Sequence, residues 1–244
     1  MRPGLALALT PVQAAWRKQQ RAQLLAARSA ASAQDRAAWS TAIHAFLVEA
    51  LDLQAPCVLG LCWPYRQEFD ARPLAAHLHA RGVRSALPVV RGPGLPLAFH
   101  HWWPGVAMDK GVYDIPVPRE TEALLPDVLF VPPVGIDALG YRLGYGGGYF
   151  DRTLASMARK PVCIATAFDL SRIASLEPQA HDVRMDFVVT ETGIAQCLPD
   201  GMQALSAAQL RSAVHNLLAE RALPHQRKVC INPSSRGAKR RGDP

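Results

Sequence analysis

The fold is decided by residues 128 to 152, which read Val128-Leu129-Phe130-Val131-Pro132-Pro133-Val134-Gly135-Ile136-Asp137-Ala138-Leu139-Gly140-Tyr141-Arg142-Leu143-Gly144-Tyr145-Gly146-Gly147-Gly148-Tyr149-Phe150-Asp151-Arg152. The first four residues form a short apolar run bounded by turn residues, which predicts a buried strand. Tyr149 to Arg159 is predicted to form a helix that begins directly after a cluster of glycines. A buried strand and a helix in this order are typical of an α/β domain.

Similar segments flank this stretch on both sides. Short apolar runs predict further strands at residues 57–62, 83–87, 97–101, 162–167 and 187–190, the last of which is expected to be the final strand. Helices are predicted at residues 12–30, around 39–47, from a cap at Asp70 to Gly82, and at 206–223. Residues 88–118 are rich in Pro and Gly and are expected to be irregular apart from the strand at 97–101. Strands that alternate with helices indicate a mostly parallel sheet covered on both faces, which is a Rossmann-like three-layer α/β/α sandwich.

Length and composition allow one sizeable core, because the chain has 244 residues, of which 49% are apolar and 19% charged. We expect an α/β domain over residues 1–198 and a C-terminal extension over residues 199–244, helical at first and then, from residue 232, basic and disordered. The net charge is +7, but residues 225–244 carry six cations and one acid, which is 6 − 1 = +5 and leaves +2 for the rest. The basic charge therefore belongs mainly to the tail, and no specific nucleic-acid partner is expected.

The cysteines and the apolar segments indicate the compartment. Five cysteines are scattered through mostly apolar runs, with no CxxC pair and no spacing that suits zinc, so we expect buried, reduced thiols. The apolar run at residues 4–9 is shorter than the roughly 7–15 residues of a signal-peptide core. No segment reaches the roughly 20 apolar residues of a membrane span. We therefore expect a soluble, cytoplasmic protein without a membrane partner.

The glycine cluster is the first candidate for a functional site, because five of the 17 glycines lie between Gly140 and Gly148. Glycines let backbone N–H groups approach an anion closely, and the N-terminus of the following helix adds a positive dipole. A flexible surface loop is the alternative, which Arg142 and Asp151 disfavour because they flank the glycines with a cation and a candidate metal ligand. The cluster is not a P-loop, which needs Gly-Lys-Ser/Thr, nor a dinucleotide fingerprint, which needs the glycines directly after the strand.

Residues 129–137 and 140–152 together resemble the characteristic stretch of the 5-formyltetrahydrofolate cyclo-ligase family. The resemblance extends to a basic N-terminal helix with Arg17, Arg21 and Arg28, to Glu68-Phe69-Asp70, and to His181-Asp182 with Met185-Asp186. It covers roughly residues 15–195. It implies a fold similar to that of CoA transferases and a monomeric ligase that uses ATP and Mg²⁺. The implied reaction converts 5-formyltetrahydrofolate, with or without a polyglutamate tail, into 5,10-methenyltetrahydrofolate after phosphorylation of the formyl oxygen, with release of ADP and phosphate.

The resemblance also implies roles for individual residues. ATP contacts are implied for Arg17, Lys18, Arg21, Arg142, Leu143, Gly144, Tyr145, Gly146, Gly147, Gly148, Tyr149 and Phe150. Contacts to the folate are implied for Trp63, Glu68, Tyr145, Gly146, Gly147, Gly148 and Tyr149. Arg142, Arg21 and Tyr149 are implied as catalytic residues, and Asp151 and Asp182 as ligands of Mg²⁺. The family usually has Lys where Arg17 stands, so the choice between Arg17 and Lys18 stays open.

Each of these roles has a plain structural alternative. On sequence alone, Arg17 and Arg21 could lie on a solvated helix face. Asp151 could be a first-turn helix acid and Asp182 a turn residue that satisfies its own backbone. Aromatic residues are more often core than ligand contacts. The family's usual Gly-Ile-Pro-Glu-Pro is replaced here by Asp114-Ile115-Pro116-Val117-Pro118, which lacks an acid on the expected substrate side.

Two other functions remain as alternatives to the ligase. The basic tail is compatible with a non-catalytic folate or RNA binding module on the same scaffold. An altered folate pocket would instead give a different ATP-using ligase or kinase. The flanking cation and acids favour the ligase, because a binding module has no need of metal ligands beside a phosphate loop.

Overall fold

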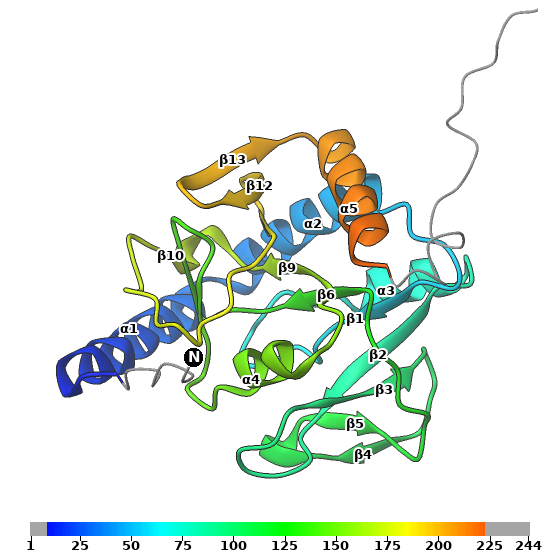
Figure 1. Ribbon diagram of the computed structural model, residues 1–244, viewed down its shortest axis with the longest axis horizontal. Coiled ribbons are helices and arrows are strands. Elements are labelled where there is room, and N and C mark those ends of the chain that lie inside the picture. Colours follow the sequence, from blue (N-terminus) through cyan, green and yellow to red (C-terminus); the bar gives the residue numbers. More distant parts are fainter. Residues whose placement is uncertain (1–8, 223–244) are drawn as a thin grey trace, which may run out of the picture.

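The computed structural model describes residues 9–222 and places them in three layers around one large sheet (Figure 1). The sheet has eight strands, which in spatial order are β13 (Gly201–Leu205), β12 (Gly193–Leu198), β11 (Phe187–Thr190), β9 (Val162–Thr166), β6 (Val128–Val131), β1 (Val58–Gly60), β2 (Arg84–Val89) and β3 (Ala98–Trp102). The five strands from β11 to β2 run parallel, and the strands at the two edges run antiparallel. The predicted α/β class with a mostly parallel sheet is confirmed.

Helices cover both faces of this sheet and build two hydrophobic cores. They are α2 (Ala33–Ala50), α3 (Arg72–His79) and α5 (Ala207–Arg221) on one face and α4 (Tyr149–Ser156) on the other. Successive residues of β6 point to opposite faces, as the two-residue period of a strand requires. Phe130 joins the core under α2, α3 and α5, whereas Leu129 packs with Leu154 of α4 on the other side.

The first helix, α1 (Pro11–Ala30), begins at a capping box. The Thr10 hydroxyl accepts a hydrogen bond from the Gln13 N–H, and the Gln13 side chain accepts one from the Thr10 N–H. Ser206 and Gln209 make the same reciprocal pair at the start of α5. These local hydrogen bonds satisfy N–H groups that have no partner within the helix, so the starts of both helices are set by nearby sequence.

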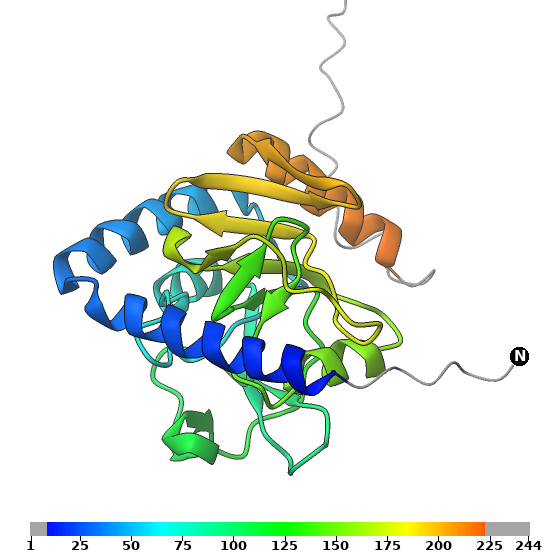
Figure 2. The same cartoon turned by 90° about the vertical axis from the view of Figure 1, so that its left-hand side faces the viewer.

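A smaller sheet lies beside the large one, and α1 packs against it. It has three strands, in the order β10 (Arg172–Ile173), β7 (Gly135–Asp137) and β8 (Arg142–Leu143). Leu24 of α1 packs there with Val134 and Leu143. Figure 2 shows α1 lying along the near side of the molecule, with α2 leading away from its end. This packing brings Arg28 and Tyr145 within 3.5 Å of each other, although they are 117 positions apart in the sequence.

The structure corrects the expected number of strands. Phe187–Thr190 is not the final strand, because β12 and β13 follow it as an antiparallel hairpin. Such half-exposed strands lack the continuous apolar run of a buried strand. Residues 88–118 are also less irregular than expected. They contain β3 and a two-stranded sheet of β4 (Met108–Lys110) and β5 (Pro116–Pro118), joined by the short 3-10 helix η1 (Val112–Asp114).

The bounds of α3 and α4 also differ from the prediction. Helix α3 ends at His79, before the predicted stop at Gly82. The N-cap of α3 is Ala71 and not Asp70, although the Asp70 carboxylate accepts a hydrogen bond from the Arg72 N–H at 3.0 Å. Helix α4 ends at Ser156 rather than at Arg159. Both helices have eight residues, so most of their backbone groups belong to a terminus, where tertiary contacts compete with local preference.

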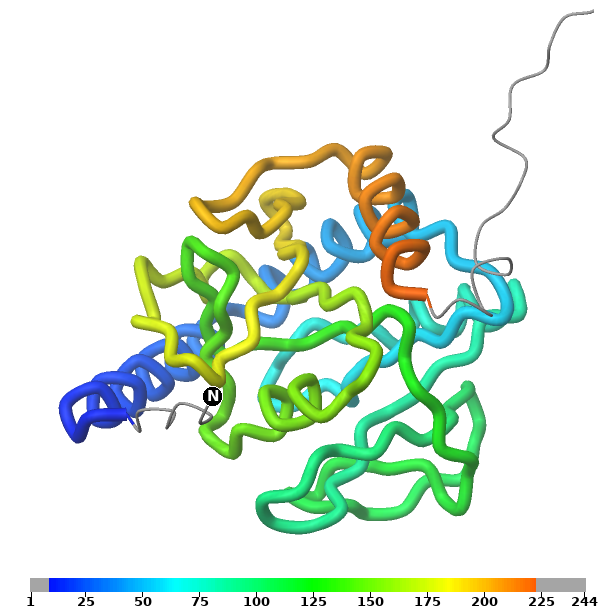
Figure 3. The backbone as a smooth tube through the Cα atoms, in the orientation of Figure 1, coloured from blue at the N-terminus to red at the C-terminus, as the bar shows by residue number. Residues whose placement is uncertain are grey.

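The first part of the expected C-terminal extension shares the main core. The helix predicted at residues 206–223 is confirmed as α5, whose Leu210, Val214 and Leu218 are buried with residues of α2. Figure 3 shows α5, in orange, beside the end of α2. The predicted disorder falls on the tail after residue 222, outside the described residues, and the division after residue 198 stays a prediction. Within residues 9–222, no helix is both long and apolar enough to span a membrane.

Candidate active site

Two cavities meet at the glycine loop, which is defined here as residues 144–148. The aromatic cavity, of about 370 Å³, has mostly apolar walls that include Trp63, Glu68, Tyr145, Tyr149 and Phe150. The polar cavity, of about 1110 Å³, has walls that include Arg17, Arg21, Leu143, Gly146 and Asp182. A common set of residues lines both cavities: Arg142, Gly144, Gly147, Gly148 and Asp151. The predicted phosphate loop is therefore the wall between two differently lined spaces.

Three arginines of α1 lie on the side of the helix that faces the site. They stand at positions 17, 21 and 28, and separations of four and seven residues place side chains on one face of a helix. Arg17 and Arg28 are buried, with 6% and 2% of their surface exposed. The alternative of a solvated helix face is therefore wrong for Arg17, and Arg21 is half-buried.

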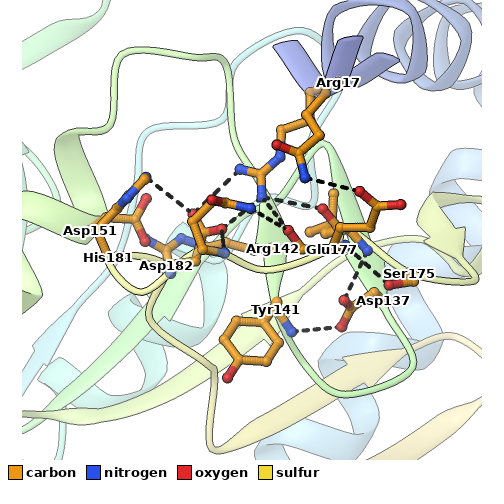
Figure 4. A network of polar contacts seen from close by, with 12 residues as sticks. Arg17, Asp137, Tyr141, Arg142, Asp151, Ser175, Glu177, His181 and Asp182 are labelled. Carbon is orange, nitrogen blue, oxygen red and sulfur yellow. Dashed lines mark hydrogen bonds and ion pairs between the residues drawn. The ribbon is translucent and has the colours of Figure 1, made fainter. Parts of the chain in front are cut away.

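Arg17 is held in an ion pair with Asp182, and Figure 4 shows the two side chains facing each other. Arg17 Nη2 lies 2.7 Å from Asp182 Oδ2 and also donates to the carbonyl oxygens of Leu176 and Glu177. Burial raises the pKa of Asp182, but the hydrogen bonds from Arg17 and from the Gln179 N–H, together with the charge of Arg17, outweigh it and hold that pKa below its ordinary value. In this arrangement Asp182 is a charged partner of Arg17.

Arg21 has no such partner among the described residues. No hydrogen bond or ion pair joins its guanidinium to residues 9–222, and its buried Nε has no acceptor. A Cβ built on Gly146 would lie 3.5 Å from Arg21 Cζ, so the guanidinium sits against the glycine loop. Burial and the charge of Arg17 both lower the pKa of Arg21. An anion in the polar cavity would relieve this repulsion, which makes Arg21 the clearest candidate there for a phosphate contact.

The glycine loop has conformations that side chains rarely adopt. Gly146 and Gly148 have φ angles of +99° and +63°, in the left-handed region. A Cβ on Gly147 would lie 2.8 Å from the ring of Tyr149. Gly148 is also the N-cap of α4 and has no side chain with which to bond the first N–H groups of that helix. The loop therefore presents bare backbone where a phosphate would approach.

Asp137 fixes the turn that leads into this loop. Asp137 is 2% exposed, and its carboxylate accepts hydrogen bonds from the N–H groups of Leu139 at 3.0 Å and Leu176 at 3.1 Å. It also accepts one from the Tyr141 N–H at 2.9 Å, which Figure 4 shows. Three N–H donors compensate for burying the charge. Asp137 belongs to the stretch quoted at the start, but sequence reasoning gave it no role.

Arg142 and Asp151 form the second ion pair of the polar cavity. Arg142 Nη2 lies 2.7 Å from Asp151 Oδ1, and Nη1 donates to the Val183 carbonyl at 2.7 Å. The Val183 N–H donates to the same Asp151 oxygen at 3.1 Å. The predicted proximity of Arg142 and Asp151 is thus present. Asp151 also lies in the first turn of α4, so its interaction with the helix dipole is present too.

The two predicted metal ligands fit Mg²⁺ to different degrees. Within residues 9–222, no group of three or more His, Cys, Asp or Glu side chains could enclose a metal ion. Mg²⁺ does not need such a cage, because it keeps several waters and binds through one or two carboxylates and substrate phosphates. Asp151 fits this role because its Oδ2 has no partner among the described residues. Asp182 fits less well because both of its oxygens face Arg17.

Glu68 is buried in the wall of the aromatic cavity. Its Oε1 accepts a hydrogen bond from the Tyr145 hydroxyl at 2.6 Å, and its Oε2 accepts one from the Tyr65 N–H at 3.0 Å. Arg28 Nη1 lies 3.8 Å from Oε1. Burial raises the pKa of Glu68 from 4.5 to about 7, because it outweighs these favourable contacts. Glu68 therefore titrates near neutral pH. Burial and Glu68 also raise the pKa of Tyr145, which keeps its hydroxyl a donor.

Much of the remaining wall of the aromatic cavity consists of aromatic and aliphatic side chains. Tyr65 and Tyr145 meet edge to face at 5.4 Å, and the Arg72 guanidinium lies 4.0 Å from the ring centre of Trp63. Val117, which stands where the family usually has an acid, lines this cavity with other residues of the β4–β5 segment. Planar heterocycles stack well on such surfaces. Glu68 is thus the carboxylate of the inner wall, whereas Asp151 stands at the border with the polar cavity.

The structure separates some of the predicted contacts. Tyr145, Tyr149 and Phe150, which were assigned to ATP, line only the aromatic cavity, and Lys18 is exposed and lines neither. Arg28 received no individual role, although its spacing from Arg17 and Arg21 signalled the same helix face. Arg221, which lines the polar cavity, gave no signal in the sequence.

The sequence of this chain is similar to those of a known protein family. Residues 13–191 match the sequence profile of the 5-formyltetrahydrofolate cyclo-ligase family. The 5-formyltetrahydrofolate cyclo-ligase of Mycolicibacterium smegmatis is 38% identical over 120 residues, which cover 45% of this chain and only 60% of that enzyme. The Escherichia coli enzyme of the same name is 31% identical over 134 residues, which cover 52% of this chain and 74% of that enzyme.

A solved structure shows the same likeness in three dimensions. The NMR structure of Aquifex aeolicus 5,10-methenyltetrahydrofolate synthetase is similar to this chain with a TM-score of 0.63 and 27% identity. The match covers 78% of this chain and 96% of that one. Because the family profile covers well over half of its residues, the chain belongs to the 5-formyltetrahydrofolate cyclo-ligase family of enzymes.

Proposed function

We propose that this protein uses Mg-ATP to close 5-formyltetrahydrofolate, with or without a polyglutamate tail, into 5,10-methenyltetrahydrofolate, with release of ADP and phosphate. The observation that carries the proposal is the shared wall of the two cavities, formed by Arg142, Asp151 and the glycine loop. A phosphoryl group can pass from a nucleotide to a folate only if the two substrates meet. The proposal places ATP in the polar cavity, the folate in the aromatic cavity and the reaction at their border.

The charges of the polar cavity support its role as the nucleotide site. Arg21 lacks an anionic partner among the described residues, and Arg142 reaches the border between the cavities. In phosphoryl transfer, catalysis comes mainly from positioning and from stabilising the charge on the moving phosphoryl group. Arg21 and Arg142 would supply that charge, while the backbone N–H groups of the glycine loop bind the phosphate oxygens. Arg17 rather than Lys18 would support them, through its pair with Asp182.

The aromatic cavity suits a pterin ring. In its ionised form the Glu68 carboxylate can accept hydrogen bonds from adjacent pterin N–H donors. Tyr145 and Arg28 hold that carboxylate in place. Trp63 and Tyr149 would stack on the rings, and Tyr149 stands directly at the border with the glycine loop.

The reaction then follows in two steps. The formyl oxygen attacks the γ-phosphorus of ATP and ADP leaves, which turns a poor leaving group into a phosphate ester. N10 of the folate next attacks the activated carbon and loses its proton to water, the new C–N bond closes the ring, and the C–O bond breaks as phosphate leaves. Mg²⁺ would neutralise phosphate charge in this site, with Asp151 as its main protein ligand and Asp182 behind it.

A near-ultraviolet absorbance time course tests the proposal. Purified protein is mixed with 5-formyltetrahydrofolate, ATP and Mg²⁺, and control mixtures lack one of the three. We expect the methenyl chromophore to grow only in the complete mixture. Folded protein that forms no chromophore contradicts the proposal. Folate binding without turnover would favour a binding module, and ATP hydrolysis without folate binding would favour a different ligase or kinase. The cytoplasmic location and the monomeric state stay predictions.

A further inference from the structure

The polar cavity receives a side chain from the last described helix. Arg221 stands near the end of α5 and is 221 − 191 = 30 positions beyond the last residue that matches the family profile. Its guanidinium makes a bidentate pair of hydrogen bonds to the Asp186 carboxylate, with Nη2 at 2.6 Å from Oδ1 and Nη1 at 2.9 Å from Oδ2. Nη1 also donates to the Pro161 carbonyl at 2.6 Å. Paired hydrogen bonds of this kind fix both partners in position and not merely in proximity.

Asp186 ends the segment 182–186, which contacts Arg17, Arg142 and Asp151 of the candidate site. Asp182 binds Arg17, and the backbone of Val183 binds both Arg142 and Asp151. The Met185 N–H donates to the carbonyl of Gly140 at 2.9 Å, at the start of the stretch that leads into the glycine loop. A shift of this segment would therefore displace both ion pairs of the polar cavity together.

Asp186 is held by hydrogen bonds from both α5 and the large sheet. The Cys163 N–H of β9 donates to Asp186 Oδ2 at 2.8 Å, and the Asp186 N–H donates to the Cys163 carbonyl at 2.9 Å. The carboxylate is 20% exposed, so removing Arg221 would leave a half-buried charge with one remaining N–H donor. The backbone of Asp186 stays bonded to Cys163 and to the Cys197 N–H of β12, so the loss favours movement of the side chain toward water.

We propose that Arg221 is a positioning residue for the nucleotide side of the active site, through which α5 fixes the segment 182–186 and its contacts with Arg17, Arg142 and Asp151. The inference rests on the proposed function, because it takes the polar cavity as the ATP site. It also gives the C-terminal helix a part in catalysis that the family match, which ends at residue 191, does not include.

Helix α5 offers a matched control. Arg211 Nη2 donates to the Glu49 carbonyl of α2, so this arginine also tethers α5 to the rest of the protein. It lines neither cavity. Arg211→Ala and Arg221→Ala each remove one contact between α5 and the rest of the protein, but only the second removes the two hydrogen bonds to the Asp186 carboxylate.

The test compares wild type, Arg221→Ala, Arg221→Lys and Arg211→Ala by calorimetric titration with Mg-ATP and by steady-state kinetics. We expect Arg221→Ala to raise the Kd and the KM for ATP about tenfold, with an unchanged KM for the folate, which binds on the other side of the border. Arg221→Lys should raise the Kd and the KM for ATP by less, because Lys keeps the positive charge but cannot make the bidentate pair of hydrogen bonds. Arg211→Ala should lower Tm slightly and leave the Kd for ATP unchanged.

The other possible outcomes contradict either the positioning role of Arg221 or the proposed function. An unchanged Kd for ATP in Arg221→Ala, or an equal rise in Arg211→Ala, contradicts the positioning role, since docking of α5 would then be the whole effect. If Arg221→Ala does not fold, the Kd of Arg221→Lys decides, and a wild-type value contradicts the inference. Wild-type protein that binds no Mg-ATP overturns the proposed function and this inference with it.

Discussion

Two acid–base pairs of the polar cavity are already formed without a bound substrate, whereas Arg21 has no partner among the described residues. Arg17 holds Asp182 and Arg142 holds Asp151, each at 2.7 Å. These pairs keep buried charges compensated, which an unpaired arginine or carboxylate would not be. If the proposed function holds, Mg-ATP would bring both a cation and an anion, and each carboxylate could turn to the metal while each arginine turns to phosphate. The pairs thus prepare the site for a ligand of mixed charge.

Asp151 should be the most sensitive of these acids to loss of charge. In Asp151→Asn the side chain can still accept from Arg142 and from the Val183 N–H, but it no longer attracts Mg²⁺. We expect kcat to fall about 100-fold or more and the Mg²⁺ concentration at half-maximal rate to rise. The measurement is turnover over a series of Mg²⁺ concentrations. Asp109→Asn, which alters an exposed pair with Arg119, is the control and should leave both values unchanged. A fully active Asp151→Asn protein would rule out the metal role.

Glu68 gives a prediction on stability against pH. Its pKa rises from 4.5 to about 7 on folding, so the folded state holds the proton more tightly than the unfolded state. Its contribution to stability is therefore complete below pH 4.5 and is lost as pH rises through about 7. The free energy of unfolding should fall by roughly 3 kcal/mol over this range from this residue alone.

In Glu68→Gln this fall should be absent, because an amide does not ionise. Urea unfolding at pH 5 and pH 8 measures the difference for wild type and for the variant. Glu49→Gln, at an exposed carboxylate of α2, serves as the control and should keep the wild-type dependence. Equal pH dependence in Glu68→Gln and wild type would contradict the burial of an ionisable Glu68.

Among the elements, the turn between β7 and β8 (residues 138–141) needs a glycine at one position to keep its conformation. Gly140 has a φ of +86°, and a Cβ there would lie 2.4 Å from Cys197 Sγ and 2.7 Å from Cys197 Cβ. The close contact joins this turn to β12, while Asp137 binds the N–H groups of the same turn from the other side. The turn that leads into the glycine loop is therefore set by packing as well as by backbone conformation.

We expect Gly140→Ala to lower the free energy of unfolding by about 2 kcal/mol or more, because both backbone strain and overpacking are added. Gly105 is the matched control, since its φ is +91° and no atom lies within 4 Å of its Cβ position. Gly105→Ala should therefore show the backbone cost without the steric one. Chemical denaturation of both variants measures the difference. Equal losses would show that the Cys197 contact relaxes without cost.

At the scale of the molecule, the aromatic cavity opens where several parallel strands end. Cys62 and Trp63 follow β1, and Pro132 follows β6. Crevices at the carboxyl ends of parallel strands are the usual ligand sites of open α/β sheets. The helix α1 and the small sheet then close the polar side of the site. The large sheet thus supplies part of the wall of the aromatic cavity, and the elements packed beside it supply most of the wall of the polar cavity.

The charge of the whole chain gives a prediction about nucleic acid. Of the formal +7, +5 belongs to residues 225–244. We expect any RNA affinity of the full chain to fall steeply with salt and to vanish when these residues are removed, with turnover unchanged. Binding to a labelled RNA at several salt concentrations, with and without the tail, measures this. RNA affinity that survives the deletion would instead point to a specific site within residues 1–224.

The sequence by itself determined the order of most strands and helices, the mostly parallel sheet and the family. Apolar runs, helix caps and the glycine cluster are local signals, and neighbouring residues alone produce them. The tertiary structure decided how these elements meet. The burial of Glu68, the exposure of Lys18, the division of the site into two cavities and the pairing of Arg221 with Asp186 all join distant segments. Their energies depend on desolvation and on contacts that exist only after packing, so no local pattern records them.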